Sequence, residues 1–260
     1  MATSTAVPRV AAVTGAARGL GRAIALRLAT DGFDVAVNDI ESAKPELESL
    51  QQEIMSHGRR SVTHVGDVSV EENVKMLVDD AAQALGKLDV MVANAGICIT
   101  KPLLETSVEE WDRIHAINSR GTFLCYKYGA QQMIKQGSGG RLIGASSVAG
   151  KQAWSSIPAY SSTKFTVRGL TQAAAGEFGK HHINVNAYAP GPIDTNMLSD
   201  IGNGLGGKDG FYKQLDKAAA LGFYDGKPED IAALVSYLAS PDSKFVTGQT
   251  IICDGGSVFD

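Results

Sequence analysis

The chain has 260 residues, of which 44% are hydrophobic and 20% charged, and its formal net charge is -4. This balance is typical of a globular protein, and the length suits one large domain with a multilayered core. No basic surface for nucleic acid is expected, and the Arg59-Arg60 pair is interpreted as a solvated helix end. No apolar run approaches the ~18 residues that a membrane span needs.

Residues 1–8 lack the charged start and apolar middle of a signal peptide. We predict a flexible N-terminal tail over 1–8 and a single domain over 9–260. The three cysteines, Cys98, Cys125 and Cys253, fit neither a zinc pattern nor a disulfide framework. Buried, reduced thiols in a cytoplasmic protein without a bound metal are therefore expected.

Short apolar runs alternate with longer segments of helical periodicity along the chain. This alternation is typical of βαβ units, in which parallel strands are covered by helices on both faces. The predicted strands cover residues 10–14, 35–38, 62–65, 90–93, 142–145, 184–187 and 250–253. The pattern predicts a Rossmann-type, doubly wound α/β fold with about seven parallel strands.

The first predicted strand runs directly into the glycine-rich stretch TGAARGLG, residues 14–21, which opens a helix. Gly15, Gly19 and Gly21 allow the backbone to turn with positive φ and to approach a ligand closely. The start of the helix then offers free N–H groups to a pyrophosphate. A literal GxGxxG match at 202–207 is rejected because no strand precedes it and it opens no βαβ unit.

The second predicted strand is followed by Asp39. A carboxylate at that position can bind the ribose hydroxyls of an adenosine and repel a 2′-phosphate. Arg18, beside the glycine-rich loop, could instead accept that phosphate. We give Asp39 more weight, because its repulsion of a phosphate is direct. NAD(H) is expected, with NADP(H) as the alternative.

Polar residues or glycines also end the next two strands. Asp67 ends the third strand, and Asn94, Ala95 and Gly96 end the fourth. Each of these residues alone is also typical of a turn. Because ligands of such sheets bind beyond the carboxyl ends of the strands, we expect these residues at the rim of a dinucleotide site.

Tyr160 and Lys164 lie four residues apart in the helical segment AYSSTKFTVRGL, so both lie on one face. That face is apolar, and burying a lysine is costly without a compensating partner. A nearby cation lowers the pKa of a phenol from about 10, which would let the pair exchange a proton with an alcohol oxygen. The alternative is a core tyrosine beside a lysine whose ammonium reaches solvent.

Two further polar residues favour a catalytic site. Ser147 ends the fifth predicted strand and can hydrogen-bond a carbonyl or alcohol oxygen. Asn118 lies in a predicted helix, where it can interrupt the regular hydrogen bonding. It would then hold a water on a proton route through Lys164.

A long insertion separates the sixth predicted strand from a helix that opens at Pro228. Residues 200–210 are glycine-rich and predicted to be irregular, whereas residues 211–222 have a helical pattern. Such insertions are often lids or binding loops. We predict a substrate lid over about 196–226, with a tolerated surface insertion as the alternative.

Taken together, these motifs resemble the short-chain dehydrogenase/reductase family over nearly the whole chain, from about Arg9 onward. The motifs stand in this order: TGAARGLG (14–21), Asp39, Asp67, NAG (94–96), Asn118, Ser147, YSSTK (160–164), PGPIDT (190–195) and DGG (254–256). Their joint order and spacing are far more specific than any one of them.

The resemblance implies a role for each matching residue. Tyr160 would be the general acid/base, and Lys164 would lower its pKa and bind the nicotinamide ribose. Ser147 would fix the substrate oxygen, and Asn118 would support the proton relay. The implied cofactor site comprises Gly15, Arg18, Gly19, Leu20, Gly21, Asp39, Asp67, Val68, Asn94, Ala95, Gly96, Tyr160, Lys164, Pro190, Gly191, Ile193 and Thr195.

Within the family, residues 160–175 and 237–260 are most similar to acetoin/diacetyl reductases and 2,3-butanediol dehydrogenases. This similarity implies a small hydroxyketone or diketone as substrate. The family resemblance implies a homotetramer in which the helix that carries Tyr160 and Lys164 lies in an interface. The lid region, which carries Phe223 and Tyr224, and Trp154 also suit a larger lipophilic ketone of secondary metabolism. One alternative is a cofactor-binding regulator without turnover, against which the intact Ser147, Tyr160 and Lys164 argue. Another is an epimerase or dehydratase on the same fold.

Overall fold

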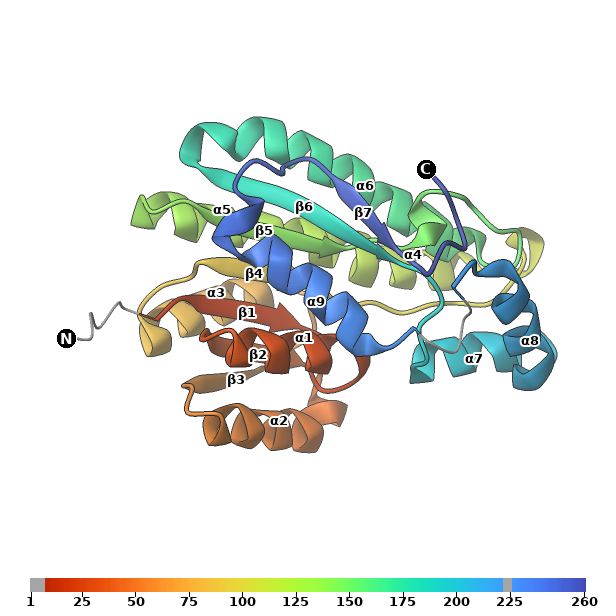
Figure 1. The fold of residues 1–260 in the computed structure, drawn as a ribbon, viewed down its shortest axis with the longest axis horizontal. Coiled ribbons are helices and arrows are strands. Elements are labelled where there is room, and N and C mark those ends of the chain that lie inside the picture. Colours follow the sequence, from red (N-terminus) through yellow and green to blue (C-terminus); the bar gives the residue numbers. More distant parts are fainter. Residues whose placement is uncertain (1–7, 222–225) are drawn as a thin grey trace.

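A parallel seven-stranded sheet forms the centre of the protein (Figure 1). The computed structural model describes residues 8–221 and 226–260, so the predicted tail falls outside the described residues except for Pro8. The strands are β1 (Val10–Thr14), β2 (Asp34–Asp39), β3 (Ser61–Val65), β4 (Val90–Ala93), β5 (Gly140–Ala145), β6 (Ile183–Pro190) and β7 (Thr250–Cys253). Their order in the sheet is β3-β2-β1-β4-β5-β6-β7.

Helices cover both faces of this sheet. They are α1 (Gly19–Thr30), α2 (Lys44–Ser56), α3 (Glu71–Leu85), α4 (Val108–His115), α5 (Gly121–Gln136), α6 (Pro158–Phe178), α7 (Asn196–Gly204), α8 (Lys208–Ala218) and α9 (Pro228–Ala239). Shorter turns are η1 (Glu41–Ala43), η2 (Leu103–Glu105), η3 (Ala116–Arg120), η4 (Val148–Gly150), η5 (Gly179–His181) and η6 (Pro241–Ser243). Helices α1, α2 and α9 pack on one face, and α3, α5 and α6 pack on the other. The predicted doubly wound α/β fold is confirmed.

The central strands are apolar throughout because both of their faces are covered. In β1, Ala11 and Val13 join the core beneath α1 and α9, whereas Val10 and Ala12 join the core beneath α3 and α5. All seven predicted strands form, and β6 runs further than predicted, to Pro190. Within the described ranges, none of the helices is both long and apolar enough to cross a membrane.

The insertion after β6 folds into the two helices α7 and α8. Residues 200–210, predicted to be irregular, belong mostly to these helices, so that prediction was wrong. Glycine disfavours helix locally, but Leu198 and Tyr212 bury their side chains between the two helices. The helix predicted over 211–222 starts earlier, at Lys208, and ends at Ala218. Residues 222–225 lie outside the described residues, with Phe223 and Tyr224 among them.

The three cysteines are free thiols. Cys125 is buried, whereas Cys98 and Cys253 are half-buried, so full burial was expected correctly only for Cys125. Burial raises the pKa of both Cys98 and Cys125 to about 12. Both thiols are therefore protonated at neutral pH.

Arg59 and Arg60 do not form a solvated helix end, contrary to the prediction. They bind the buried carboxylate of Asp34, with N–O distances of 2.5 Å from Arg59 and 2.8 Å from Arg60. Burial alone would raise the pKa of Asp34, but hydrogen bonds from Arg60 and the charge of Arg59 outweigh it and lower that pKa. The two ion pairs tie the start of β2 to the residues before β3.

Replacing Asp34 by Asn should destabilise the protein by about 2–3 kcal/mol, because two guanidiniums lose their buried counter-charge. Urea unfolding at fixed protein concentration measures this loss. Glu41→Gln is the control, since its ion pair with Lys44 is exposed and 4.0 Å long. The lowered pKa of Asp34 means that its contribution is present at neutral pH and lost as pH falls through that pKa, so wild type and Asp34→Asn should converge in acid. Equal free energies of unfolding for wild type and Asp34→Asn at neutral pH would contradict the structural role of Asp34.

Candidate active site

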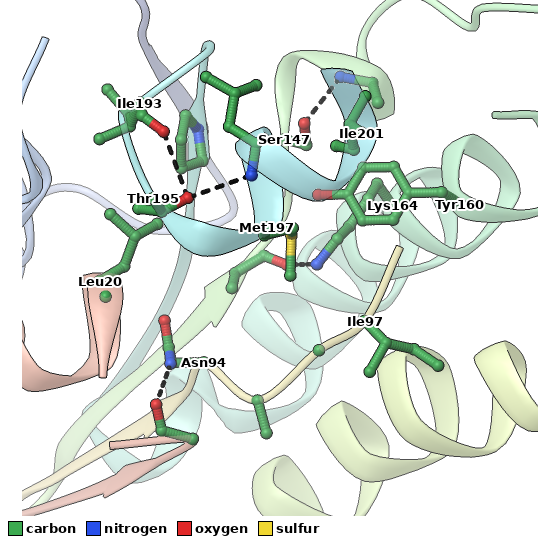
Figure 2. Close-up of a pocket in the computed structure, with 18 of the residues that line it drawn as sticks. Leu20, Asn94, Ile97, Ser147, Tyr160, Lys164, Ile193, Thr195, Met197 and Ile201 are labelled. Atoms are coloured by element: carbon green, nitrogen blue, oxygen red, sulfur yellow. Dashed lines mark hydrogen bonds between the residues drawn. The ribbon is translucent and has the colours of Figure 1, made fainter. Parts of the chain in front are cut away.

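A cavity of about 980 Å³ opens at the carboxyl ends of the strands. Every residue predicted from the sequence for the catalytic or cofactor site lines it, with the exception of Asn118. The residues come from the carboxyl ends of β1 to β6 and the chain that follows them, from the start of α1 and from α6, which lie far apart in the sequence. Figure 2 shows part of this cavity, with Leu20 and Asn94 on one side and Ser147, Tyr160 and Lys164 further along. The topology therefore brings the predicted motifs together around one space.

The glycine-rich loop after β1 has no room for side chains at two positions. Gly15 has φ +62°, and a Cβ there would lie 2.8 Å from the Cα of Ala95. A Cβ at Gly21 would lie 2.1 Å from the carbonyl oxygen of Gly15. Arg18, just before α1, caps that helix with no side-chain hydrogen bond. The N–H groups of the first turn of α1 are thus available to an anion at the cavity.

Asn94 joins this loop to the neighbouring strand. Its Nδ2 donates to the carbonyl oxygens of Thr14 (2.9 Å) and Gly15 (3.1 Å). Its Oδ1 accepts a 2.8 Å hydrogen bond from the hydroxyl of Tyr188, a buried residue of β6 that the sequence did not single out. The backbone N–H groups of Asn94 and Ala95 both donate to Thr14 Oγ1. The amide of Asn94 is therefore oriented by partners on both sides.

Asp39 braces the loop and also lines the cavity. Its Oδ2 accepts a 2.9 Å hydrogen bond from the N–H of Ala17, and its Oδ1 accepts one from the N–H of Ile40. An ionised carboxylate has about four lone-pair sites, so it can still accept from a ligand hydroxyl. The next residue, Ile40, is exposed, and its side chain has no donor for a phosphate. Arg18 also lines the cavity, and its guanidinium is a basic group that could bind a 2′-phosphate.

Tyr160 and Lys164 are both buried on α6, with exposed fractions of 9% and 4%. The Nζ of Lys164 donates a 2.8 Å hydrogen bond to the carbonyl oxygen of Ala145, at the end of β5, and lies 5.3 Å from the centre of the Tyr160 ring (Figure 2). The alternative of a lysine that reaches solvent is therefore wrong. Burial lowers the pKa of Lys164 to about 8, against the opposing effect of Cys98.

The pKa of Tyr160 is raised, which is opposite to the direction expected from a neighbouring lysine. Burial is the main cause, interaction with Cys98 adds to it, and a hydrogen bond with Ser147 acts against it. The sequence could not reveal this direction, because it depends on how completely α6 is covered. A protonated phenol is the form that can give a proton to a carbonyl oxygen.

Ser147 follows β5 and is 8% exposed at the cavity. Its Oγ accepts a 3.1 Å hydrogen bond from the N–H of Ala149 as the chain turns into η4. That bond uses only an acceptor site of the hydroxyl, so Ser147 can still donate its one proton, either to the phenol oxygen of Tyr160 or to a ligand oxygen between them.

Asn118 lies behind the cavity, in η3, a π-helical turn between α4 and α5. The predicted local interruption of the helix is confirmed. The side chain is 1% exposed and bonds both the N–H and the carbonyl of Ile97 at 2.9 Å, and Thr163 Oγ1 at 3.1 Å. Asn118 thus fixes the loop after β4 against α6. Its contact on that helix is Thr163, the residue before Lys164.

Apolar side chains line the far part of the cavity, and sequence reasoning named only Trp154 among them. They come from the loop after β4, from the segment before α6, and from α7 and α8. The set comprises Ile97, Trp154, Ile157, Met197, Ile201, Leu205, Phe211 and Leu215. The predicted lid pointed to the cavity residues on α7 and α8. Ser257 and Val258 also line the cavity, but no sequence motif marks them as site residues. Within residues 8–221 and 226–260, no group of three His, Cys, Asp or Glu side chains is placed to hold a metal.

Comparison with known proteins gives consistent similarities. The family model described as enoyl-(acyl carrier protein) reductase matches residues 15–258. A short-chain dehydrogenase/reductase of Armillaria gallica is 50% identical, over 99% of this chain and 99% of its own. An L-2,3-butanediol dehydrogenase of Corynebacterium glutamicum is 40% identical, over 97% of this chain and 99% of its own. The solved structure of a carveol dehydrogenase from Mycobacterium avium in complex with NAD aligns with a TM-score of 0.92 at 32% identity, covering 98% of this chain and 99% of that one.

Proposed function

Because the chain belongs to the short-chain dehydrogenase/reductase family, we propose that it interconverts a secondary alcohol and a ketone with NAD(H), with Tyr160 as the general acid/base. One observation carries the proposal. The cavity that begins at the glycine-rich loop continues without a break to Ser147, Tyr160 and Lys164. A dinucleotide held at the loop can therefore share one cavity with a proton donor.

The cavity fits such a cofactor on its own geometry. The positions of Gly15 and Gly21 leave no room for a Cβ, and the start of α1 offers N–H groups without side-chain partners. These groups would hold the diphosphate, Asp39 the adenosine ribose, Asp67 and Val68 the adenine, and Lys164 the nicotinamide ribose. Asn94, Ala95 and Gly96 would line the central part, and Pro190, Gly191, Ile193 and Thr195 the nicotinamide end. When bound, NAD(H) would supply or accept the hydride that is exchanged with the carbinol carbon.

The proton is handled by this chain's own residues. Ser147 donates a hydrogen bond to the substrate oxygen and holds it beside the phenol of Tyr160. In ketone reduction Tyr160 gives its proton to that oxygen, and in alcohol oxidation the phenolate takes it back. Because the pKa of Lys164 is lowered only to about 8, its side chain is protonated in most protein molecules at pH 7. The positive charge stabilises the phenolate of Tyr160. Asn118 would support the return of a proton by holding the loop at Ile97 against the side chain of Thr163, the residue before Lys164.

Three observations support NAD(H) over NADP(H). Asp39 lines the cavity where it would repel a 2′-phosphate, and the adjacent Ile40 has no donor to bind one. The structural relative from Mycobacterium avium is described in complex with NAD. Arg18 is the feature that favours NADP(H).

A small hydroxyketone or diketone is the first candidate substrate, supported by the 40% identity to the L-2,3-butanediol dehydrogenase. A larger lipophilic ketone is the second candidate. A specific observation favours it, namely the continuous apolar wall formed by Trp154, Met197, Ile201, Phe211 and their neighbours. Burying a longer apolar substituent on that wall would add affinity that a four-carbon substrate cannot gain.

We further propose that the chain forms a single catalytic domain with a substrate lid over about 196–226. The protein would be cytoplasmic and would assemble as a homotetramer. Phe165 on α6 and Phe123 on α5 are 41% and 46% exposed, which suits a helical face covered by a second copy. Light scattering after size exclusion would measure the mass, and a monomer would contradict the assembly.

Replacing Tyr160 by Phe should lower kcat by at least about a thousandfold, because the phenyl ring keeps the packing but has no proton to give. Binding of NADH, followed by its fluorescence, should be retained. Tyr126→Phe is a matched control, since Tyr126 is also buried but its hydroxyl bonds the hydroxyl of Thr171 and the carbonyl of Asn186 and does not line the cavity. Retained turnover in Tyr160→Phe would rule out Tyr160 as the acid/base.

A panel of ketones assayed with NADH and with NADPH tests the function itself. We expect oxidation of NADH in preference to NADPH, and chiral analysis of the product should show one alcohol enantiomer. Diacetyl and acetoin represent the first candidate, and cyclic or aryl ketones the second. Absence of cofactor oxidation throughout would favour a non-catalytic regulator, and conversion without net cofactor use would favour an epimerase or dehydratase. A preference for NADPH would show that Arg18 outweighs Asp39.

A further inference from the structure

Residues 254–260, which follow β7, form a compact turn at the edge of the cavity. We call them the strap; in Figure 1 they are the dark blue trace that leads from β7 to the C-terminus. Asp254 accepts hydrogen bonds from the N–H groups of Gly256 (2.8 Å) and Val258 (2.7 Å). The hydroxyl of Ser257 donates back to the carbonyl of Asp254. These bonds hold Ser257 and Val258 where they line the cavity.

The strap is joined to the exit of lid helix α8. The N–H of Ala220 donates to the carbonyl of Gly256 (3.3 Å), and the N–H of Leu221 donates to the carbonyl of Gly255 (2.8 Å). The approach is close, because a Cβ on Gly256 would lie 2.9 Å from the Cβ of Ala220. Two backbone hydrogen bonds thus join the strap to the residues that follow α8.

The strap is also joined to the segment that carries Ser147. Lys151 follows η4 directly, and its ammonium binds the carboxylate of Asp260. The Lys151 side chain is only 6% exposed, whereas that of Asp260 is 49% exposed. Burying an ammonium is costly without a counter-charge, and Asp260 supplies that counter-charge to Lys151. The hydrogen bond and charge of Lys151, with a smaller effect of Arg168, lower the pKa of Asp260, which keeps it ionised at neutral pH.

We propose that the Lys151–Asp260 ion pair fixes the strap as a wall of the substrate site and thereby couples α8 to the Ser147 segment. Lys151 and Asp260 are positioning residues, and Val258 determines substrate specificity by its contact with the ligand. The specificity part rests on the proposed ketone reductase function. The coupling part does not, because it follows from bonds within the chain.

Hydrogen–deuterium exchange of the apoprotein tests the coupling without any substrate. In Asp260→Asn, peptides covering the strap and residues 219–221 should exchange at least about fivefold faster than in wild type. Lys151→Met should do the same without leaving a buried, unpaired charge. Asp260→Glu should restore wild-type exchange by re-forming the pair. Glu71→Gln, which removes the 2.8 Å surface pair with Lys127, is the matched control and should leave these peptides unchanged.

Steady-state kinetics with the best ketone of the panel tests the consequence for the site. Asp260→Asn and Lys151→Met should raise KM for the ketone about tenfold, while the Kd for NADH changes by less than about twofold. Val258→Ala should leave exchange at wild-type rates but shift the ratio of kcat/KM between small and large ketones.

Each outcome decides a separate part of the proposal. Unchanged exchange in both ion-pair variants would overturn the coupling. Faster exchange with an unchanged ketone KM, or an equal loss of NADH affinity, would overturn the role of the strap in the substrate site. If the wild type reduces no ketone, the proposed function and the specificity role of Val258 fail together, and exchange alone then decides the coupling.

Discussion

The burial of the Lys164 ammonium is the constraint on which the candidate active site of this protein depends. The charge finds an acceptor in the carbonyl of Ala145, so the end of β5 must lie against α6. The backbone carbonyl of Lys164 in turn accepts from the hydroxyl of Ser146. Gly150 lies so close to that carbonyl that a Cβ would approach it to 2.6 Å. Ser147 is thereby held beside Tyr160, which lies one helical turn away from the lysine.

At the glycine-rich end of the cavity, hydrogen bonds between uncharged groups fix the structure. Polar atoms at the strand ends bind one another and leave the cavity walls fixed before any ligand enters. Thr14, Asn94 and Tyr188 form a chain of hydrogen bonds that holds the glycine-rich loop against β4 and β6. Such pre-organisation lowers the entropy cost of binding a long, flexible dinucleotide.

How much the sequence predicts depends on the range of the interactions involved. The strands and the loop at Gly15 follow from local patterns, since continuous apolar runs and glycine spacing act over a few residues. The helices α7 and α8 were missed in part, because their glycines disfavour helix until Leu198 and Tyr212 pack together. Lys151 and Asp260 are 109 residues apart, and no local signal joins them. The raised pKa of Tyr160 likewise depends on covering by distant elements.

The binding of NADH to Lys164→Met tests most directly whether the buried lysine serves a ligand. Methionine keeps the length and apolar body of the side chain but has no charge to place on a ribose. A charge-assisted hydrogen bond contributes about 1.5–3 kcal/mol, so the Kd for NADH should rise at least about tenfold when it is measured at a temperature at which the variant is folded. An unchanged Kd in a folded Lys164→Met protein would show that the lysine serves only the packing of α6 and would contradict its role in binding the nicotinamide ribose.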